Sequence, residues 1–347
     1  MSRKVRWGVI GSGGIARRRT IPEGIMKADN AELVAVYDVD TRVNTEVAKS
    51  FGVHAASSID ELLESGIDTV YLATPAYLHA EQAIECAEAS KHILCEKPLG
   101  MNPAETARMR KACAENGVKL GIGFMMRFQS QHQAALSLIR EGKLGKPVYG
   151  RAQLSCWYPP IPGSWRQDPE KGGGGSLIDM GGHCIDLLTM FFGPVERVSC
   201  FINNTIHPYR SEDSAVALLS FANGAMASVD TFFCIQDASS LNALELYGSK
   251  GSVLATNTIG QGDRGEMTAY LEGGDAGYAA QQNREIGGGI RISPEPRNTY
   301  RSEIEEWSSA ILESRISALD SRIGVENQKI LDACYLSARS GKSVDIV

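Results

Sequence analysis

The segment most suggestive of chemistry reads GGGGSLIDMGGHCID and runs from Gly172 to Asp186. If it forms a helix, Asp179, His183 and Asp186 share one face, because their spacings are four and three residues. A carboxylate beside an imidazole is a proton-handling pair, in which the carboxylate orients the ring and favours its charged form. The same residues would also suit a buried polar pair in a core helix, so this segment alone leaves both interpretations open.

Length and composition limit the elements that can position such a pair. At 347 residues the chain exceeds the size at which one core keeps growing, so two domains are expected. A net charge of -6 argues against nucleic acid or an anionic membrane as the main partner. There is no apolar run long enough to span a bilayer and no signal-peptide pattern. The eight cysteines are scattered singly, which predicts reduced thiols, a cytoplasmic protein and no zinc or other metal site.

The N-terminus carries a nucleotide-binding pattern. A strand-like run at 5–10 leads directly into G-x-G-x-x-A, from Gly11 to Ala16, and a helix should follow. Glycines permit the tight turn and a close approach to a pyrophosphate, and the helix N-terminus supplies amides. We therefore expect cofactor contacts along this turn, at Gly11, Gly13, Gly14 and Ile15.

A second strand, at 33–37, ends at Asp38. An acid at this position binds the adenosine ribose hydroxyls and would repel a 2′-phosphate, which favours NAD over NADP. The alternative is that Asp38 is only a turn-forming acid.

Strands and helices then alternate, which predicts a parallel, doubly wound sheet. Buried strands are expected at 69–73, 91–95 and 118–124, with helices at 79–89 and 103–116. Ligands bind at the carboxyl ends of such strands, where Thr74, Glu96 and Lys97 fall. A lysine in a cleft at a strand end can donate to a substrate hydroxyl, although an exposed loop lysine is the commoner case.

Four motifs occur in order along the chain: GSGGIA after a strand, TP-x-x-x-H, CEKP and GGGxxxDxGxHxxD. Their order and spacing resemble the glucose–fructose oxidoreductase and inositol dehydrogenase family, often called Gfo/Idh/MocA, over nearly the whole chain. The resemblance implies an α/β protein. It would have an N-terminal Rossmann domain at 1–124 and a C-terminal α/β domain at 125–347 with a large, mainly antiparallel open sheet. That sheet often forms the subunit interface in the family, so a homodimer or homotetramer is expected.

The resemblance also implies residue roles. The family's catalytic lysine, aspartate and histidine fall on Lys97, Asp179 and His183. Further cofactor contacts are implied at Thr74, Pro75, His79, Glu96, Lys97, Arg127, Trp165 and Arg166. The chain departs from the family's usual T-P-N, which reads Thr74-Pro75-Ala76 here, and this puts one contact near the cofactor in doubt.

The second half of the chain predicts a sheet with covering helices. Helices are expected at 131–141, 299–314 and 327–340, and strands at 148–157, 195–203, 214–220, 225–234 and 241–247. Residues 257–297 are rich in glycine and polar residues, which indicates a long excursion over the sheet edge. An aromatic, proline-rich loop at 157–165 could stack Tyr158 on a sugar ring or could pack on its own domain.

Together these observations predict an NAD-dependent oxidoreductase acting on a secondary hydroxyl of a sugar, polyol or glycoside, or reducing the matching ketone. In this hypothesis His183 takes the hydroxyl proton, Asp179 holds His183, and Lys97 hydrogen-bonds the reacting oxygen; with Tyr158 these residues bind substrate. Two alternatives stay open. One is an enzyme that retains NAD and oxidises a sugar transiently during glycoside cleavage, and the other is a non-catalytic, nucleotide-responsive sensor.

Overall fold

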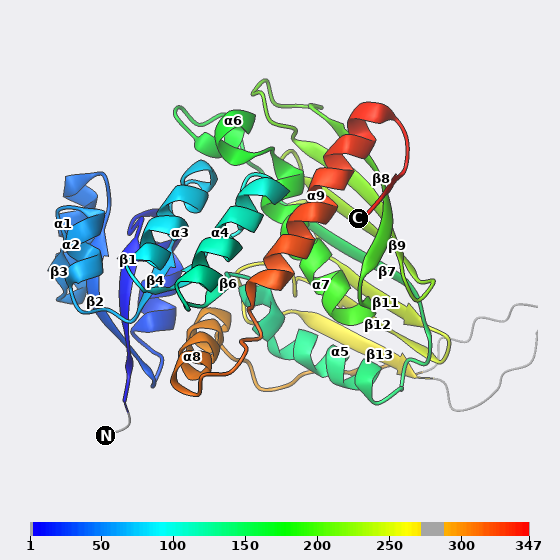
Figure 1. Cartoon of the computed structure of the whole chain (residues 1–347). Coiled ribbons are helices and arrows are strands. Elements are labelled where there is room, and N and C mark those ends of the chain that lie inside the picture. The colour runs from blue at the N-terminus through cyan, green and yellow to red at the C-terminus, as the bar shows by residue number, and fades with distance from the viewer. Residues whose placement is uncertain (1–2, 272–287, 347) are drawn as a thin grey trace, which may run out of the picture.

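A computed structural model describes residues 3–271 and 288–346. Two sheets lie side by side, and Figure 1 shows the N-terminal sheet and its helices at one end of the molecule and the larger sheet at the other. The two sheets are the expected Rossmann unit and the expected open sheet, so the predicted fold class is confirmed.

The first sheet is parallel throughout, with strand order β3-β2-β1-β4-β5-β6. Its strands are β1 (Val5–Ile10), β2 (Ala31–Tyr37), β3 (His54–Ala55), β4 (Thr69–Leu72), β5 (His92–Cys95) and β6 (Leu120–Ile122). Its helices are α1 (Thr41–Phe51), α2 (Ile59–Glu64), α3 (His79–Glu88) and α4 (Pro103–Glu115), with a short 3₁₀ turn η2 (Ala76–Leu78). The carboxyl ends of β1, β2, β4 and β5 meet at one edge, and this edge carries the residues expected to bind the cofactor.

The second sheet is mixed, with strand order β14-β13-β12-β11-β7-β10-β9-β8-β15. The pair of β7 and β10 is parallel, and the other pairs are antiparallel. Its strands are β7 (Pro147–Ser155), β8 (Val195–Asn203), β9 (Ser214–Phe221), β10 (Met226–Phe232), β11 (Leu244–Gly248), β12 (Gly251–Thr256), β13 (Glu266–Leu271), β14 (Ile290–Arg291) and β15 (Val344–Asp345). The segment 257–297, expected to be a long excursion over the sheet edge, supplies two of these strands, β13 and β14. Its residues 272–287 lie outside the described residues.

Helices cover one face of this sheet (Figure 1). They are α5 (Ser130–Arg140), α7 (Gly182–Phe192) and α9 (Ser321–Ser340), preceded by the short turns η3 (Met125–Phe128), η4 (Trp165–Gln167) and α6 (Pro169–Gly172). Leu187, Leu188 and Phe192 of α7 are buried, and one core joins this helix to strand residues such as Leu219 and Leu246.

Helix α8 (Thr299–Leu312) returns to the first sheet, although the predicted boundary at residue 124 places it in the second domain. Trp307 is buried, and its indole N–H donates to Thr69 on β4 at 3.0 Å. Trp7 on β1 donates to Ser308 at 3.2 Å. The C-terminal part of the chain thus helps to build the N-terminal core.

Two segments expected to be α-helical have π-helical hydrogen bonding: η1 (Ala16–Ile25), after the glycine turn, and η5 (Leu177–Gly181), which carries Asp179. The wider π turn changes which side chains lie above one another, and such turns are frequent at functional sites. Among the described residues, none of the helices has the length and apolar character to cross a bilayer.

Candidate active site

The glycine turn after β1 forms the floor of a cleft of about 440 Å³. Gly11 has φ +82°, and a Cβ there would lie 2.7 Å from the carbonyl carbon of Ala73, so the turn requires glycine. Gly14 has no atom within 4 Å of the place where its Cβ would be, which leaves open space beside the start of η1. A turn of this shape has room for a pyrophosphate held by backbone amides.

Asp38 lies in the same cleft, at the end of β2. Its carboxylate accepts from the amide of Gly13 at 2.9 Å and from the amide of Asp40 at 3.0 Å. Both bonds hold the carboxylate against the glycine turn, where adenosine ribose hydroxyls are expected.

The residues that follow β4 and β5 also line the cleft; they are Thr74, Pro75, Glu96 and Lys97. His79, an expected cofactor contact, does not line the cleft. The imidazole is 1% exposed and lies within hydrogen-bonding distance of the carbonyl oxygens of Pro98 (2.8 Å) and Thr74 (2.9 Å). His79 therefore ties together the two loops that line the cleft.

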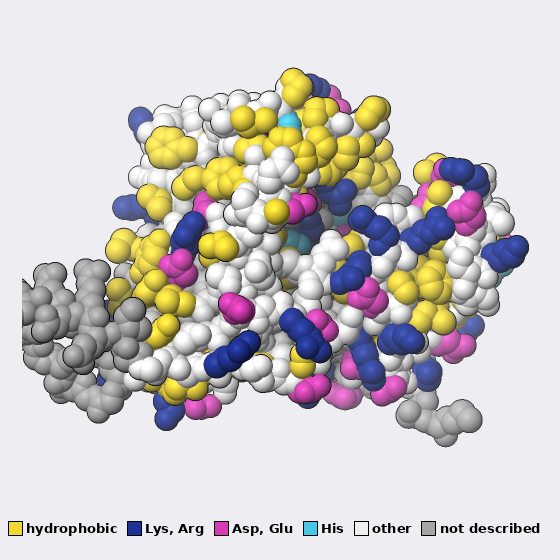
Figure 2. All heavy atoms as spheres, turned by 180° about the vertical axis from the view of Figure 1, so that it is seen from behind, with side chains coloured by type: hydrophobic (Ala, Val, Ile, Leu, Met, Phe, Trp, Pro, Cys, Tyr) yellow, Lys and Arg dark blue, Asp and Glu magenta, His cyan; other side chains and the backbone are white. Residues whose placement is uncertain are grey.

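A second cavity, of about 670 Å³, continues from the first. Residues shared by both cavities are Ile15, Arg18, Glu96, Lys97 and Arg166. Figure 2 shows a hollow near the middle of the molecule's rear face, between its two halves. A dinucleotide in the first cavity would thus reach toward a second ligand in the other.

Lys97 lies at the junction of the two cavities and pairs with Asp179 from the other domain. Its Nζ donates to Asp179 Oδ1 at 2.6 Å and to the Asp179 carbonyl oxygen at 2.9 Å. Arg166 Nε donates to the same Oδ1 at 3.2 Å. Burial alone would raise the pKa of Asp179, but the charges of Lys97 and Arg166 outweigh it and hold the pKa well below its usual range. Asp179 is therefore a carboxylate clamped between two cations.

His183 lines the second cavity but does not pair with Asp179, which differs from the sequence expectation. The imidazole packs edge-on against Phe124, with ring centroids 5.6 Å apart, and its Nδ1 has no partner among the described residues. The Asp179 carboxylate is instead bound by Lys97 and Arg166. Burial, and then the charge of Lys97, lower the pKa of His183 to about 3, while Asp179 opposes the shift.

Asp186, placed by the sequence on the same face as His183, pairs with Arg127 instead. Its carboxylate accepts from Nε at 2.9 Å and from Nη2 at 2.7 Å of the guanidinium. Arg127, an expected cofactor contact, lines neither of the two joined cavities. The pair instead joins the end of the Rossmann unit to α7.

Trp165, Arg166 and Tyr158, all predicted site residues, line the joined cavities. Trp165 lines the first cavity, with the Arg166 guanidinium 4.2 Å from the centroid of its ring, and Tyr158 lines the second cavity. Several polar residues of the second cavity had no predicted role: Arg18, Ser155, Asp237, Asn242 and Gln261. Arg18 lies on η1, just after the glycine turn, and the others come from isolated positions in loops, in a short 3₁₀ turn and at a strand end, where no sequence motif marks them.

Behind Lys97 lies a buried acidic cluster. The Tyr71 hydroxyl donates to Glu96, and the Thr20 hydroxyl donates to Tyr71 at 2.9 Å. Glu303, on α8, is fully buried, and its carboxyl oxygens have no partner among the described residues. Burial, and then the charge of Glu96, raise the pKa of Glu303 well above its usual range, so its carboxyl group is held neutral.

The fold and this cavity pair define a class: a dinucleotide-binding domain that presents a lysine, joined to a domain that presents an aspartate and a histidine beside it. Comparison with known proteins agrees. Residues 5–124 match the family description "Oxidoreductase family, NAD-binding Rossmann fold", and residues 132–254 match "GFO/IDH/MocA C-terminal domain".

Individual relatives cover most of the chain. Myo-inositol 2-dehydrogenase from Thermotoga maritima is 31% identical over 77% of this chain and 82% of its own length. The 1,5-anhydro-D-fructose reductase of Ensifer adhaerens is 29% identical over 88% of both chains. Among solved structures, the WlbA dehydrogenase from Bordetella pertussis, in complex with NADH and UDP-GlcNAcA, has a TM-score of 0.83 and 25% identity, covering 99% of each chain.

The chain belongs to the Gfo/Idh/MocA family of oxidoreductases. Its relatives are named dehydrogenases and reductases, so it is an oxidoreductase acting on CH–OH groups. This favours an enzyme over the sensor alternative.

Proposed function

We propose that the protein transfers a hydride between NAD and a secondary hydroxyl, or the matching ketone, of a sugar, polyol or glycoside. One observation carries the proposal: Lys97, Asp179 and His183 line one cavity that continues into the glycine-turn cleft. A reacting carbon in that cavity would lie next to a dinucleotide whose pyrophosphate is held at Gly11–Gly14.

The residues divide the chemistry between them. An ammonium group has three N–H donors, and Lys97 directs two hydrogen bonds to Asp179, which leaves one for the reacting oxygen. That bond favours alkoxide character as the hydroxyl proton leaves. His183 is neutral because it is buried, so its ring can accept the proton. Asp179 positions Lys97 and Arg166. The nicotinamide, when bound, supplies the hydride acceptor or donor.

We propose NAD as the cofactor because the Asp38 carboxylate faces the first cavity from the end of β2. A 2′-phosphate there would meet a like charge, whereas ribose hydroxyls would find an acceptor.

We propose that the open face of the larger sheet pairs with a second copy of the chain. The face opposite the covering helices carries exposed apolar side chains on three adjacent strands: Phe201 on β8, Leu218 on β9 and Met226 on β10. Figure 2, seen from behind, shows yellow side chains gathered over the upper part of the molecule. Such a face marks an interface. Light scattering should give the mass of a dimer or tetramer, and Leu218→Lys should reduce it.

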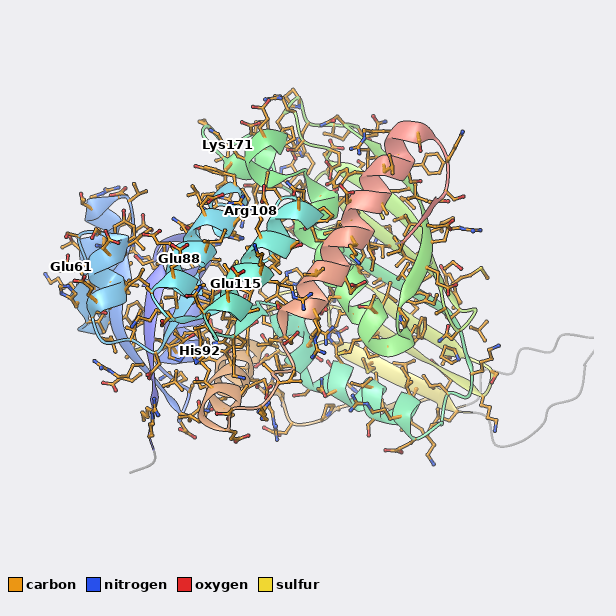
Figure 3. All side chains as sticks on the ribbon, viewed as in Figure 1. Glu61, Glu88, His92, Arg108, Glu115 and Lys171 are labelled. Carbon is orange, nitrogen blue, oxygen red and sulfur yellow. The ribbon has the colours of Figure 1, made fainter. Side chains whose placement is uncertain are left out.

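The function is tested by incubating the protein and NAD with panels of polyols, aldoses, anhydrosugars and glycosides, and following reduced nicotinamide by absorbance. With an active substrate, Lys97→Met and His183→Gln should each lower kcat about 10²- to 10⁴-fold. Lys171→Met is the matched control, since Lys171 on α6 (Figure 3) is exposed and lines neither cavity, and it should keep full turnover. NADH binding, followed by fluorescence, should persist in all three variants. Near-normal turnover by His183→Gln would refute the role of the imidazole.

A further inference from the structure

The segment that leads into η5 consists of four glycines, Gly172 to Gly175. Because these residues have no side chains, neighbouring elements must hold the segment in place. Gly174 and Gly175 precede η5, and a Cβ on either would overlap a neighbour: the Tyr335 hydroxyl at Gly174 and the Glu212 carbonyl oxygen at Gly175. Glycine is required here because these neighbours approach the backbone so closely. Glu212 and Tyr335 therefore lie directly against the backbone that leads into η5.

Glu212, in the loop between β8 and β9, binds three consecutive amides at the start of η5. Its carboxylate accepts from the Gly175 amide at 2.8 Å and from the Leu177 amide at 3.0 Å, and its carbonyl oxygen accepts from the Ser176 amide at 3.0 Å. The first amides of a helical segment lack partners within the helix, and a negative charge there is favourable. Tyr335 on α9 donates its hydroxyl to the same carboxylate at 2.9 Å, and the Glu212 side chain is buried.

These bonds lead directly to the reacting groups. Gly175 donates its N–H to the Glu212 carboxylate, and its carbonyl oxygen accepts a hydrogen bond from the Asp179 amide at 3.1 Å. Asp179 in turn receives both hydrogen bonds from Lys97. Glu212 lines neither of the two joined cavities and lies instead at a separate hollow of about 430 Å³. It therefore acts on the site only through the backbone of η5.

We propose that Glu212 is a positioning residue, which fixes the η5 turn so that Asp179 holds the Lys97 ammonium at the reacting oxygen. The inference rests on the proposed function, since it assigns Lys97 and Asp179 to that reaction. A displacement of the η5 turn by about 1 Å would be enough to lower turnover about 10²-fold.

The neighbouring residue provides a matched control. Asp213 is also a carboxylate that binds three consecutive backbone amides, those of Thr205, Ile206 and His207, each at 2.8 Å. These amides belong to a loop outside both cavities. Asp213→Asn should thus destabilise the fold as Glu212→Gln does, but without moving η5.

The test compares Glu212→Gln, Asp213→Asn and Tyr335→Phe by amide hydrogen exchange and by steady-state kinetics at pH 8. In Glu212→Gln one of the two amides bonded to the carboxylate side chain faces an NH₂ group, so exchange of the Gly175, Leu177 and Asp179 amides should accelerate at least tenfold. Its kcat should fall about 10- to 100-fold, with the KM for NAD unchanged. Tyr335→Phe keeps both of those bonds and should lose less than about threefold in kcat.

In Asp213→Asn the same three amides and kcat should stay at wild-type values. Wild-type exchange at these amides in Glu212→Gln, or an equal loss of kcat in Asp213→Asn, would overturn the proposal. The exchange measurement needs no substrate. If the wild-type protein oxidises none of the sugars and polyols tested, the proposed function fails, while the exchange result still decides whether Glu212 holds η5.

Discussion

Burial of His183 leads to a measurable prediction: the imidazole stays neutral far below the pH at which histidine usually titrates. The side chain is 9% exposed, its ring packs against Phe124, and the Lys97 ammonium lies in the same cavity. Burial and this positive charge lower its pKa from 6.5 to about 3. At pH 5.5 an ordinary histidine would be about 90% protonated, whereas this one would be less than about 1% protonated.

The same shift makes the fold less stable in acid. The unfolded chain binds a proton at this residue below pH 6.5, but the folded chain does not, so stability falls as the pH drops from 6.5 toward 3. Between pH 7.5 and pH 5 the loss attributable to His183 is about 2 kcal/mol, at about 1.4 kcal/mol for each pH unit below 6.5.

Two measurements check this without a substrate. Urea unfolding at pH 7.5 and pH 5 should show that His183→Gln loses about 2 kcal/mol less stability than the wild type. NMR of the histidine rings, with His183 assigned from the same variant, should show no titration of its signal above pH 4. Lys97→Met removes one cause of the shift and should raise the midpoint, while Lys171→Met should not. A His183 signal that titrates near pH 6.5 in the wild type would refute the assignment of a buried, neutral base.

Three further predictions concern the surrounding structure. In Gly175→Ala the new Cβ should overlap the Glu212 carbonyl oxygen, which should lower stability by about 1–3 kcal/mol and kcat about 10²-fold. In Gly182→Ala the new Cβ would lie 3.4 Å from its nearest neighbour, so stability and kcat should both be retained. Thermal unfolding and steady-state kinetics compare the two variants. Asp38→Ala should lower kcat/KM for NAD about tenfold or more with little change for NADP, and a wild type that prefers NADP would contradict the argument. Glu303→Gln should stabilise the protein more at pH 8 than at pH 5, because the raised pKa of Glu303 makes wild-type stability fall as the pH rises above 4.5; urea titrations at both pH values would show it.

The features that local sequence rules could predict are those set by neighbours in the chain. The turn at Gly11 needs φ +82° and a close approach to Ala73, and only glycine meets both conditions. The ends of β2, β4 and β5 meet at one edge because parallel strands must, which brought Asp38, Thr74 and Lys97 to one cleft.

The partners of each polar group depended on contacts that sequence spacing does not encode. Helical periodicity paired Asp179 with His183, but the cations Lys97 and Arg166 are the partners of the carboxylate. Glu212 lies 35 residues from Leu177, and no local pattern links the two. Likewise, helix α8 packs on the first sheet through hydrogen bonds of Trp307 and Trp7, although a single domain boundary at residue 124 assigns this helix to the second domain.

The chemistry of this site depends on the joint between the domains. Lys97 follows a Rossmann strand, whereas Asp179 comes from the second domain, so this ion pair exists only when the domains hold one orientation. Arg166, also from the second domain, holds the same carboxylate from its own side of the joint. The Arg127–Asp186 pair fixes the same joint from outside the cavities. Because a carboxylate clamped by two cations is costly to separate, the joint should resist opening while Asp179 is charged. Catalytic geometry and domain orientation are thus set by the same contacts, because the Lys97–Asp179 pair lies both at the proposed reacting site and across the joint.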